Sequence, residues 1–219
     1  MIKAIIFDLD GTLLNRDASV VKFIEEQYER LNDVLGYIPK EEYIKRFIEL
    51  DYRGYIWKDK VYQKLTQEYN IRKISWETLL EDYLATFKNH CVPFPNLIHM
   101  LEELKKRSIR LGMITNGFGQ FQMDNIKALG ITDYFDSIII SETEGLRKPN
   151  PAIFHRALNR LGIDASESIF VGDHPDNDVA ASMNVGMKGV WKKDPQWNDV
   201  EADFIIDDLL ELMPIVERF

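Results

Sequence analysis

Short, continuous runs of apolar residues recur along the chain. The first covers residues 4–7 and is interrupted by the charged residue Asp8. Gly11, which favours a turn, follows shortly after. An apolar run of this length, bounded by a turn signal, is typical of a strand buried on both faces of a sheet. We predict five further strands of this kind, at residues 111–115, 138–141, 169–171, 189–191 and 204–206.

Helical patterns separate several of these strands. One segment repeats leucine at helical spacing from Leu97 to Leu104, and another is opened by Pro151 and closed by Gly162. Proline is common at the first position of a helix and glycine just after its last. Strand and helix alternate from about residue 94 onward. This alternation predicts an α/β fold, a doubly wound parallel sheet between helices.

The pattern differs between Asn15 and Val92, where no buried-strand run occurs and apolar residues recur at helical spacing. Four stripes are present: Val20, Ile24, Tyr28, Leu31 and Leu35; Tyr43, Ile44, Phe47 and Ile48; Val61, Leu65 and Tyr69; and Trp76, Leu80, Tyr83, Leu84 and Phe87. Such stripes predict amphipathic helices. We therefore expect a helical domain, 15–92, inserted into a core domain formed by 1–14 and 93–219. Proline at positions 93 and 95 marks the return to the core, because proline disfavours helix.

Composition and charge narrow the functional classes. No stretch approaches the roughly 20 apolar residues that span a bilayer, and the N-terminus becomes acidic before a signal-peptide core develops, so we expect no membrane partner. Cys91 is the only cysteine, which favours a reducing compartment, and the cytoplasm fits best. A formal net charge of -9 repels polyanions, so we expect no nucleic-acid partner.

Two carboxylates follow the first predicted strand directly, in Asp8-Leu9-Asp10-Gly11-Thr12. The glycine allows the chain to turn sharply beneath them. Open α/β sheets bind ligands at the carboxyl ends of their strands, so chemistry is expected at this position. A single aspartate would more often only end a strand, but the complete string favours a functional site.

Two shorter patterns follow later strands. Thr115-Asn116-Gly117 joins a hydroxyl to a turn whose backbone N–H groups could face an anion. Lys148 lies between a predicted strand and the helix opened by Pro151. Taken alone, the first pattern also fits an ordinary strand-to-loop junction, and the second fits a solvated lysine.

A second acidic cluster follows the strand predicted at 169–171. Asp173, Asp176 and Asp178 lie close together in the sequence after Gly172. Like charges at this spacing repel one another unless a cation neutralises them, and hard oxygen ligands suit Mg²⁺. An acidic surface loop is the alternative. Position favours a metal site, because this cluster and Asp8 both follow strands of one sheet.

Together these elements resemble the motifs of the haloacid dehalogenase-like hydrolase superfamily. The four motifs occur in order: Asp8-x-Asp10-Gly11-Thr12, Thr115, Lys148, and Gly172-Asp173 with Asp178. The resemblance covers the whole chain, and the helical insert resembles the type 1 cap domain of that superfamily. It implies a Mg²⁺-dependent phosphatase that hydrolyses small phosphate monoesters through an aspartyl-phosphate.

The resemblance also implies the roles of individual residues. Asp8 would be the nucleophile and a metal ligand. Asp10 would be the general acid/base and would offer its backbone carbonyl to Mg²⁺. Members of the superfamily that cleave carbon–halogen bonds lack an aspartate at this position, so Asp10 favours phosphoryl transfer.

The remaining motif residues would bind the phosphoryl group and the metal. Thr115 and Lys148 would contact the phosphoryl oxygens, with help from the backbone N–H of Asn116. Asp173 would ligate the metal and Asp178 would support it. Physical chemistry agrees, because a carboxylate attacks a phosphate dianion only when cations neutralise their mutual repulsion.

Two other functions remain open at this point. A phosphomutase of the same superfamily would return the phosphoryl group to a sugar, and Arg53 or Lys58 of the insert could hold that sugar. A non-enzymatic phospho-accepting receiver domain also uses Asp, Mg²⁺, a hydroxyl and a lysine. That domain predicts neither a helical insert nor a fourth acidic motif, and this sequence has both.

The substrate depends on side chains of the insert whose orientation the sequence does not reveal. The segment from Arg53 to Lys58 joins basic and aromatic residues around Gly54 and could touch a substrate, or could simply connect two helices. Nucleoside monophosphates, sugar phosphates and phosphoglycolate-like acids all remain candidates, and the oligomeric state is left open. The histidines show no metal-ligand spacing and are predicted to be structural or solvated, except His174, which lies inside the fourth motif and is assigned no role.

Overall fold

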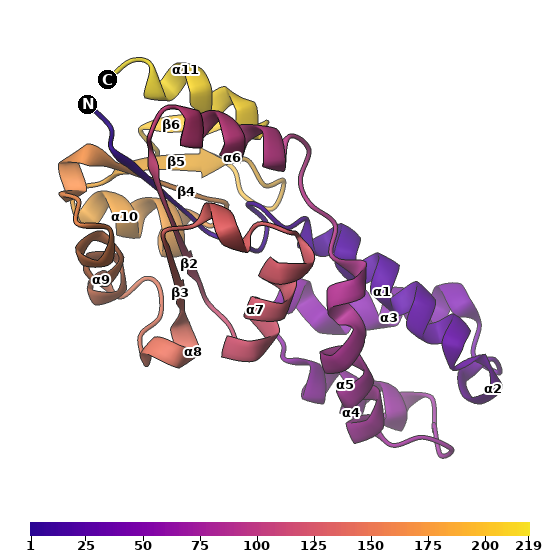
Figure 1. Ribbon diagram of the computed structural model, residues 1–219. Coiled ribbons are helices and arrows are strands. Elements are labelled where there is room, and N and C mark those ends of the chain that lie inside the picture. Colours follow the sequence, from indigo (N-terminus) through magenta and orange to yellow (C-terminus); the bar gives the residue numbers. More distant parts are fainter. The chain divides into compact units, whose positions relative to one another are not determined.

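The computed structural model describes residues 1–219, and the chain forms two compact units (Figure 1). The first unit comprises Met1–Asn15 and Pro93–Phe219, and the second comprises Arg16–Val92. None of the helices has the length and apolar character needed to cross a membrane.

The first unit is built on one six-stranded parallel sheet in the order β3-β2-β1-β4-β5-β6. Its strands are β1 (Ala4–Phe7), β2 (Arg110–Thr115), β3 (Ser137–Ile140), β4 (Ser168–Gly172), β5 (Lys188–Lys192) and β6 (Phe204–Ile206). The predicted α/β fold class and all six predicted strands are therefore confirmed. One boundary was wrong, since Ser141 begins helix α8 instead of ending β3.

Helices cover both faces of this sheet. They are α6 (Leu97–Lys106), α7 (Gly119–Ala128), α8 (Ser141–Glu144), α9 (Pro151–Leu161), α10 (Ala181–Asn184) and α11 (Leu212–Val216). Figure 1 shows α9 and α10 on one face, and α6 and α11 on the other. Four short turns of helix complete the unit: η3 (Thr132–Tyr134), η4 (Ala165–Glu167), the π-helical turn η5 (Pro175–Ala180) and η6 (Leu209–Glu211).

Strand β1 lies in the centre of the sheet and is buried along its whole length. Ala4 and Ile6 point to the face covered by α9, where they join a core with Phe154 and Phe170. Side chains alternate along a strand, so Ile5 faces the opposite layer and is equally buried. Burial on both faces explains why this strand appears in the sequence as an uninterrupted apolar run.

The ends of helix α9 follow the expected capping chemistry. The Asn150 side chain accepts a hydrogen bond from the Ala152 N–H, and Pro151 occupies the first turn. Gly162 ends the helix with φ +63°. These are the start and stop signals that the sequence predicted for this helix.

The second unit is entirely helical. Its elements are α1 (Arg16–Arg30), α2 (Asn32–Leu35), α3 (Lys40–Asp51), η1 (Tyr52–Gly54), α4 (Lys58–Glu68), α5 (Trp76–Thr86) and η2 (Phe87–His90). The helical prediction is confirmed for each of the four stripes, but the first stripe is broken at Leu31, between α1 and α2. Two stripe residues, Ile48 and Leu84, are exposed by 38% and 40% of their surface.

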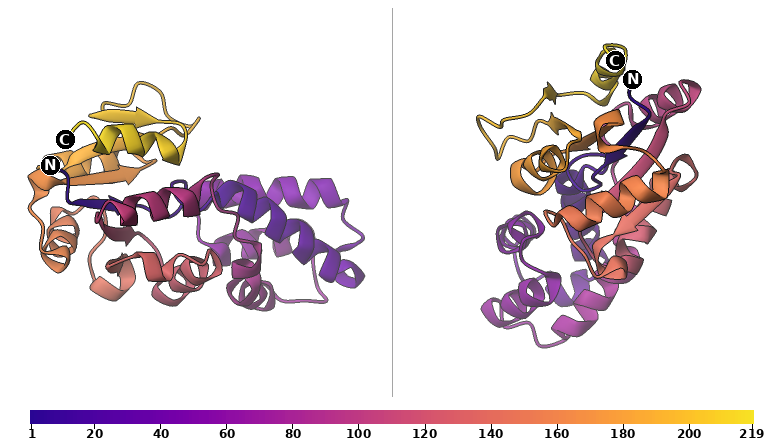
Figure 2. Two further views of the ribbon diagram at one scale, coloured as in Figure 1. Left: turned by 45° about the horizontal axis from the view of Figure 1, so that its top comes forward. Right: turned by 90° about the vertical axis from the view of Figure 1, so that its left-hand side faces the viewer.

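The carboxyl ends of three neighbouring strands bring the predicted motifs together. Phe7, the last residue of β1, pairs with Met113 of β2 and with Val171 of β4. The residues that follow these strands therefore lie at one edge of the sheet. The chain termini belong to the same unit and lie side by side in both views of Figure 2.

Candidate active site

Three carboxylates meet at the carboxyl ends of β1 and β4. Asp8, Asp173 and Asp178 each offer an oxygen, and these oxygens lie within 4.8 Å of one another. Gly11 is needed for this approach, because a Cβ at its position would lie 2.3 Å from Asp173 Oδ2. Its φ of +87° is also a conformation that side chains disfavour. The glycine that follows the two aspartates therefore has a steric reason to be there.

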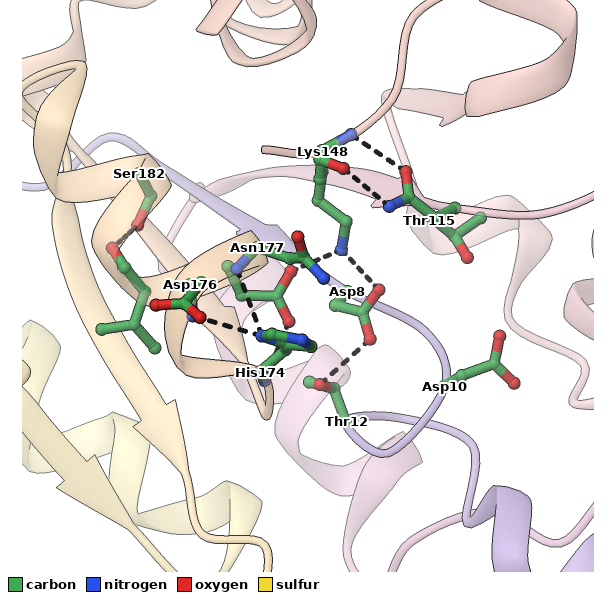
Figure 3. A network of polar contacts seen from close by, with 12 residues as sticks. Asp8, Asp10, Thr12, Thr115, Lys148, His174, Asp176, Asn177 and Ser182 are labelled. Atoms are coloured by element: carbon green, nitrogen blue, oxygen red, sulfur yellow. Dashed lines mark hydrogen bonds and ion pairs between the residues drawn. The ribbon is translucent and has the colours of Figure 1, made fainter. Parts of the chain in front are cut away.

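The turn after β4 holds Asp178 in the cluster. The chain continues into the π-helical turn η5, and His174 Nδ1 accepts hydrogen bonds from the N–H groups of Asp176 and Asn177 (Figure 3). The His174 N–H in turn donates to Asp178 Oδ2. A Cβ at Gly172 would lie 2.4 Å from Asp178 Cβ, so this turn also requires a glycine. His174 therefore acts as the N-cap of the turn that carries the acidic motif.

Lys148 enters the cluster from the loop between α8 and α9. It is 3% exposed, and its Nζ lies 2.6 Å from Asp8 Oδ1 and 2.6 Å from Asp178 Oδ1. Asn116 fixes the backbone at this point, because its Nδ2 donates to the Lys148 carbonyl and its Oδ1 accepts from the Lys148 N–H. The side chain of Asn116, adjacent to β2, therefore determines where the lysine enters the site.

The cluster carries more negative than positive charge. Burial raises the pKa of Asp8 to about 7, against the opposing effect of Lys148, and Asp178 adds to the rise. Burial also raises the pKa of Asp173 well above its usual range, and the Asp8 charge adds to it. Burial lowers the pKa of Lys148, but Asp178 and Asp8 outweigh this effect and hold that pKa above its usual value.

This charge balance suits a divalent cation. When all are ionised, three carboxylates and one ammonium leave an excess of two negative charges within the buried cluster. Converging carboxylate oxygens are also the ligands that hard divalent ions prefer. Asp8, Asp173 and Asp178 could therefore hold such an ion.

The Asp10 side chain lies outside this cluster, although the sequence predicted Asp10 beside Asp8. Figure 3 shows its carboxylate turned away from that of Asp8. Its Oδ2 instead accepts a hydrogen bond of 2.6 Å from Gln122 Nε2, which also donates to Thr115 Oγ1 at 2.8 Å. The neighbouring hydroxyl of Thr12 donates to Asp8 Oδ2 at 3.3 Å.

All of the predicted site residues lie at this edge of the first unit, but some contacts could not be read from the sequence. Gln122 lies in the first turns of α7, and a polar residue on a helix is ordinarily solvated. The Asn116 side chain contacts the Lys148 backbone, a partner that periodicity does not identify. The spacing of seven residues between Thr115 and Gln122 was the available signal, and it has meaning only once the strand-to-helix turn is known.

Known proteins resemble this chain over almost its entire length. The family model described as "Haloacid dehalogenase-like hydrolase" matches residues 5–192. Glyceraldehyde 3-phosphate phosphatase from Methanocaldococcus jannaschii is 31% identical, with 100% of this chain and 98% of the relative covered. The enzyme of the same name from Pyrococcus furiosus is 30% identical, covering 99% and 94%.

A solved phosphatase structure also matches this chain. The crystal structure of a HAD phosphatase from Thermococcus onnurineus shares 30% identity and a TM-score of 0.69, with 98% of each chain covered. The family match spans more than half of the chain, and phosphatase relatives near 30% identity span essentially all of it. The chain therefore belongs to the haloacid dehalogenase-like hydrolase family, as a phosphoric monoester hydrolase of its phosphatase branch.

Proposed function

We propose that this protein is a Mg²⁺-dependent phosphatase that hydrolyses small phosphate monoesters through an aspartyl-phosphate on Asp8. The observation that carries the proposal is the buried Asp8 carboxylate, which shares one cluster with Asp173 and Asp178 and contacts Lys148 at 2.6 Å. A carboxylate in such a site is a suitable nucleophile once its negative charge, and that of the phosphate, is neutralised.

The metal would be held by carboxylate oxygens of Asp8, Asp173 and Asp178 and by the backbone carbonyl of Asp10. When bound, it supplies positive charge against the phosphoryl oxygens. Lys148 adds a second cation, since its ammonium is already buried between two of these carboxylates.

In the first step, a carboxylate oxygen of Asp8 forms a bond to phosphorus, and the bond between phosphorus and the ester oxygen breaks. Asp10 donates a proton to the leaving oxygen. Thr115, Lys148 and the backbone N–H of Asn116 bind the phosphoryl oxygens as charge shifts onto them. The product is an aspartyl-phosphate on Asp8 and the free alcohol.

In the second step, water attacks phosphorus and Asp10 accepts a proton from it. The bond between phosphorus and the Asp8 oxygen breaks, which releases inorganic phosphate and restores both carboxyl groups. A single side chain can serve both steps. Once the Asp10 carboxyl group has donated its proton in the first step, it is the carboxylate that accepts a proton in the second.

The proposed substrates are small phosphorylated metabolites. The two relatives named above are glyceraldehyde 3-phosphate phosphatases, so three-carbon phosphate esters are the first candidates. We assign the second unit, Arg16–Val92, the role of a cap that selects among such esters. The reducing cytoplasm remains the proposed compartment, since the chain has one cysteine.

A metal-dependent screen of purified protein against a panel of phosphomonoesters tests the proposal. The panel contains glyceraldehyde 3-phosphate, sugar phosphates, nucleoside monophosphates and p-nitrophenyl phosphate, each assayed with Mg²⁺ or with EDTA. Asp8→Asn should lower turnover by more than about 10³-fold, because it removes the nucleophile. Asp176→Asn is the matched control, since Asp176 lies in the same acidic loop but is exposed and outside the carboxylate cluster.

Two results would contradict the proposal. Full turnover by Asp8→Asn excludes Asp8 as the nucleophile. Hydrolysis that is unchanged in EDTA excludes the metal.

A further inference from the structure

We propose that Gln122 is a positioning residue that fixes the Asp10 carboxylate in place relative to the Thr115 hydroxyl. The inference rests on the proposed function, which gives Asp10 the role of acid and base and Thr115 that of phosphoryl ligand. Gln122 touches neither substrate nor metal in this scheme. It acts on the reaction through the two side chains that its amide binds.

The Gln122 amide is buried and makes both contacts with one nitrogen. Gln122 is 3% exposed, and its Nε2 lies 2.6 Å from Asp10 Oδ2 and 2.8 Å from Thr115 Oγ1. A primary amide nitrogen carries two hydrogens, so one nitrogen can donate to both oxygens. The two acceptors come from segments far apart in the sequence, because Asp10 follows β1 and Thr115 ends β2.

The orientation of the amide follows from its neighbours. Asn125 Nδ2 donates to Gln122 Oε1 at 3.3 Å. The reversed amide would place Oε1 against the Asp10 carboxylate, where two acceptors would repel each other. The hydrogen-bond network is therefore consistent with only one orientation of the Gln122 side chain.

Gln122 also has little room to move. A Cβ at Gly117 would lie 2.8 Å from Gln122 Cγ, so the turn after β2 packs closely on the glutamine stem. Gln122 belongs to α7, whose first turn follows that same turn. The side chain is thus held by a helix, a tight turn and Asn125, which is the support a positioning residue needs.

These contacts have a direct consequence for the Thr115 hydroxyl. A hydroxyl carries one hydrogen and two lone pairs. Because the oxygen accepts from Gln122, its own hydrogen can donate to a phosphoryl oxygen. Thr115 is 1% exposed, so the loss of the Gln122 donor would leave a buried hydroxyl to find another partner.

The consequence for Asp10 is one of geometry. Gln122 binds Oδ2, which leaves Oδ1 to exchange the proton with the leaving oxygen and with water. Proton transfer requires a heavy-atom distance near hydrogen-bond length, so a carboxylate with no fixed partner would meet the reacting atom less often. Gln122 therefore sets the position of the acid/base relative to the phosphoryl-binding hydroxyl.

The experiment compares Gln122→Leu with Gln122→Glu, which keeps the length of the side chain but loses the donors when ionised. For each variant, kcat/KM is measured with p-nitrophenyl phosphate and with an alkyl phosphate such as glycerol phosphate. This parameter reports the phosphorylation step, and only the alkyl leaving group depends strongly on protonation by Asp10. The ratio of the two kcat/KM values should change by at least about tenfold in favour of the aryl ester, within the 10²–10⁴-fold that general acid catalysis contributes.

Two further readouts separate positioning from structural damage. Acid quench and intact-protein mass spectrometry should detect the aspartyl-phosphate on Gln122→Leu, because the attacking water also depends on Asp10. In an Asp10→Ala background, Gln122→Leu should lower kcat/KM by a much smaller factor than in the wild-type protein. The effects of two residues that act through one group are not additive.

Gln120→Leu is the matched control. Gln120 lies on the same helix, is exposed and donates to Asp124 Oδ1 at 2.8 Å. This variant should keep the wild-type ratio. If Gln122→Leu does not fold by circular dichroism, the comparison rests on Gln122→Glu and the wild-type protein.

Each outcome decides between defined alternatives. If the wild-type enzyme is active but the Gln122 variants keep the wild-type ratio of the two kcat/KM values, or lose both activities equally, the positioning role of Gln122 is contradicted. The proposed function is not affected by that result. A wild-type protein that hydrolyses no phosphomonoester contradicts the proposed function, and the role of Gln122 with it.

Discussion

Two glycines allow carboxylates to approach the backbone at the site. A Cβ on Gly11 would clash with the Asp173 carboxylate, and a Cβ on Gly172 would clash with the Asp178 side chain. Gly11 belongs to the first acidic motif and Gly172 to the fourth. Each of them lies against an aspartate of the fourth motif. Space for these aspartates is therefore built into the backbone, and a substitution as small as a methyl group would disturb it.

Replacement of Gly11 by alanine should damage the site more than the fold. The new methyl group would displace the Asp173 carboxylate, which lies 2.3 Å from its position, so hydrolysis should fall by about 10²-fold or more and need more Mg²⁺. The φ of +87° should also cost about 1–2 kcal/mol of stability. Initial rates over a range of Mg²⁺ concentrations and thermal unfolding measure the two effects.

Gly130→Ala is the control for this prediction. Gly130 has a φ of +69° with no atom within 4 Å of the position of its Cβ, so alanine meets the same backbone strain without a collision. This variant should lose a similar amount of stability and keep its activity. Equal losses of activity in both variants would show that strain, and not the displaced carboxylate, explains the effect.

Site residues could be predicted from the sequence where they directly follow the carboxyl end of a strand. Asp8 and Asp173 follow buried runs, and the parallel sheet brings such positions to one edge. Gln122 and the Asn116 side chain could not be predicted in this way. Their partners, Asp10 and Lys148, become neighbours only through the turn after β2 and the loop after α8.

At the scale of elements, the strands were more predictable than the helices of the second unit. Central strands are buried on both faces, so every residue of β1 is apolar. A surface helix buries only one stripe, and the width of that stripe depends on its neighbours. Ile48 and Leu84 fit a helical period and are nonetheless exposed. The end of α1 at Arg30 has no glycine or proline to mark it, so the break before α2 was not predicted.

Helices α1 and α5 are joined by a polar network centred on Asp82. Arg30 donates from Nη1 to Oδ1 at 2.7 Å and from Nη2 to Oδ2 at 2.9 Å, and Gln27 Nε2 donates to Oδ2 at 2.8 Å. Gln27 is itself fully buried and accepts from the Tyr62 hydroxyl at 2.8 Å. The network therefore links α4 as well and should contribute to the stability of the second unit.

This network predicts a pH-dependent stability. Burial raises the pKa of Asp82, but the hydrogen bonds from Arg30 and Gln27 outweigh it and hold that pKa below its ordinary value. A pKa that is lower in the folded state stabilises the protein above the unfolded value of about 3.9. This contribution is lost as the pH falls through the lower, folded pKa. Asp82→Asn should therefore lower the unfolding temperature at pH 7, and the difference from wild type should shrink below about pH 4.

Thermal unfolding of wild type and Asp82→Asn between pH 3 and 7 provides the measurement. Asp33→Asn serves as the control, because Asp33 is an exposed carboxylate of α2 outside the network. A difference between wild type and Asp82→Asn that is the same at every pH would mean that the Asp82 charge does not stabilise the fold.

At the scale of the whole molecule, the two units have different proposed roles, chemistry in the first and substrate selection in the second. The first unit contains every residue assigned to chemistry, and the second contains a loop with unusual backbone geometry. Tyr52, Arg53 and Gly54 have φ values of 45°, 55° and 87° in succession. Left-handed conformations at two non-glycine residues each cost of order 1–3 kcal/mol, and such strain is found where a site is preorganised.

A buried ionic cluster supports this loop within the second unit. Asp51, 2% exposed, accepts hydrogen bonds from Arg16 at 2.9 Å and from the buried ammonium of Lys58. Asp51 ends α3 and Lys58 begins α4, so the cluster ties together the two ends of the loop. Gly54 also lies against Arg16, since a Cβ at its position would be 2.8 Å from the guanidinium carbon. The loop is therefore held in one conformation by Arg16, Asp51 and Lys58.

A loop held at this cost is expected to recognise a ligand, and we predict that it selects the substrate. Arg53→Ala should change the ratio of kcat/KM between glyceraldehyde 3-phosphate and a sugar phosphate by about tenfold or more, because a single charged contact to a ligand contributes roughly 1.5–3 kcal/mol. Hydrolysis of p-nitrophenyl phosphate should change much less, because that ester depends on the chemistry of the first unit. Arg46→Ala is the control, since Arg46 is an ion-paired arginine of the same unit, bound to Glu68 as Arg53 is bound to Asp17, but it lies within α3 and outside this loop. If Arg53→Ala lowers the rates of all three esters equally, or of none, the loop after α3 does not determine selectivity and the strained backbone serves the fold of the second unit.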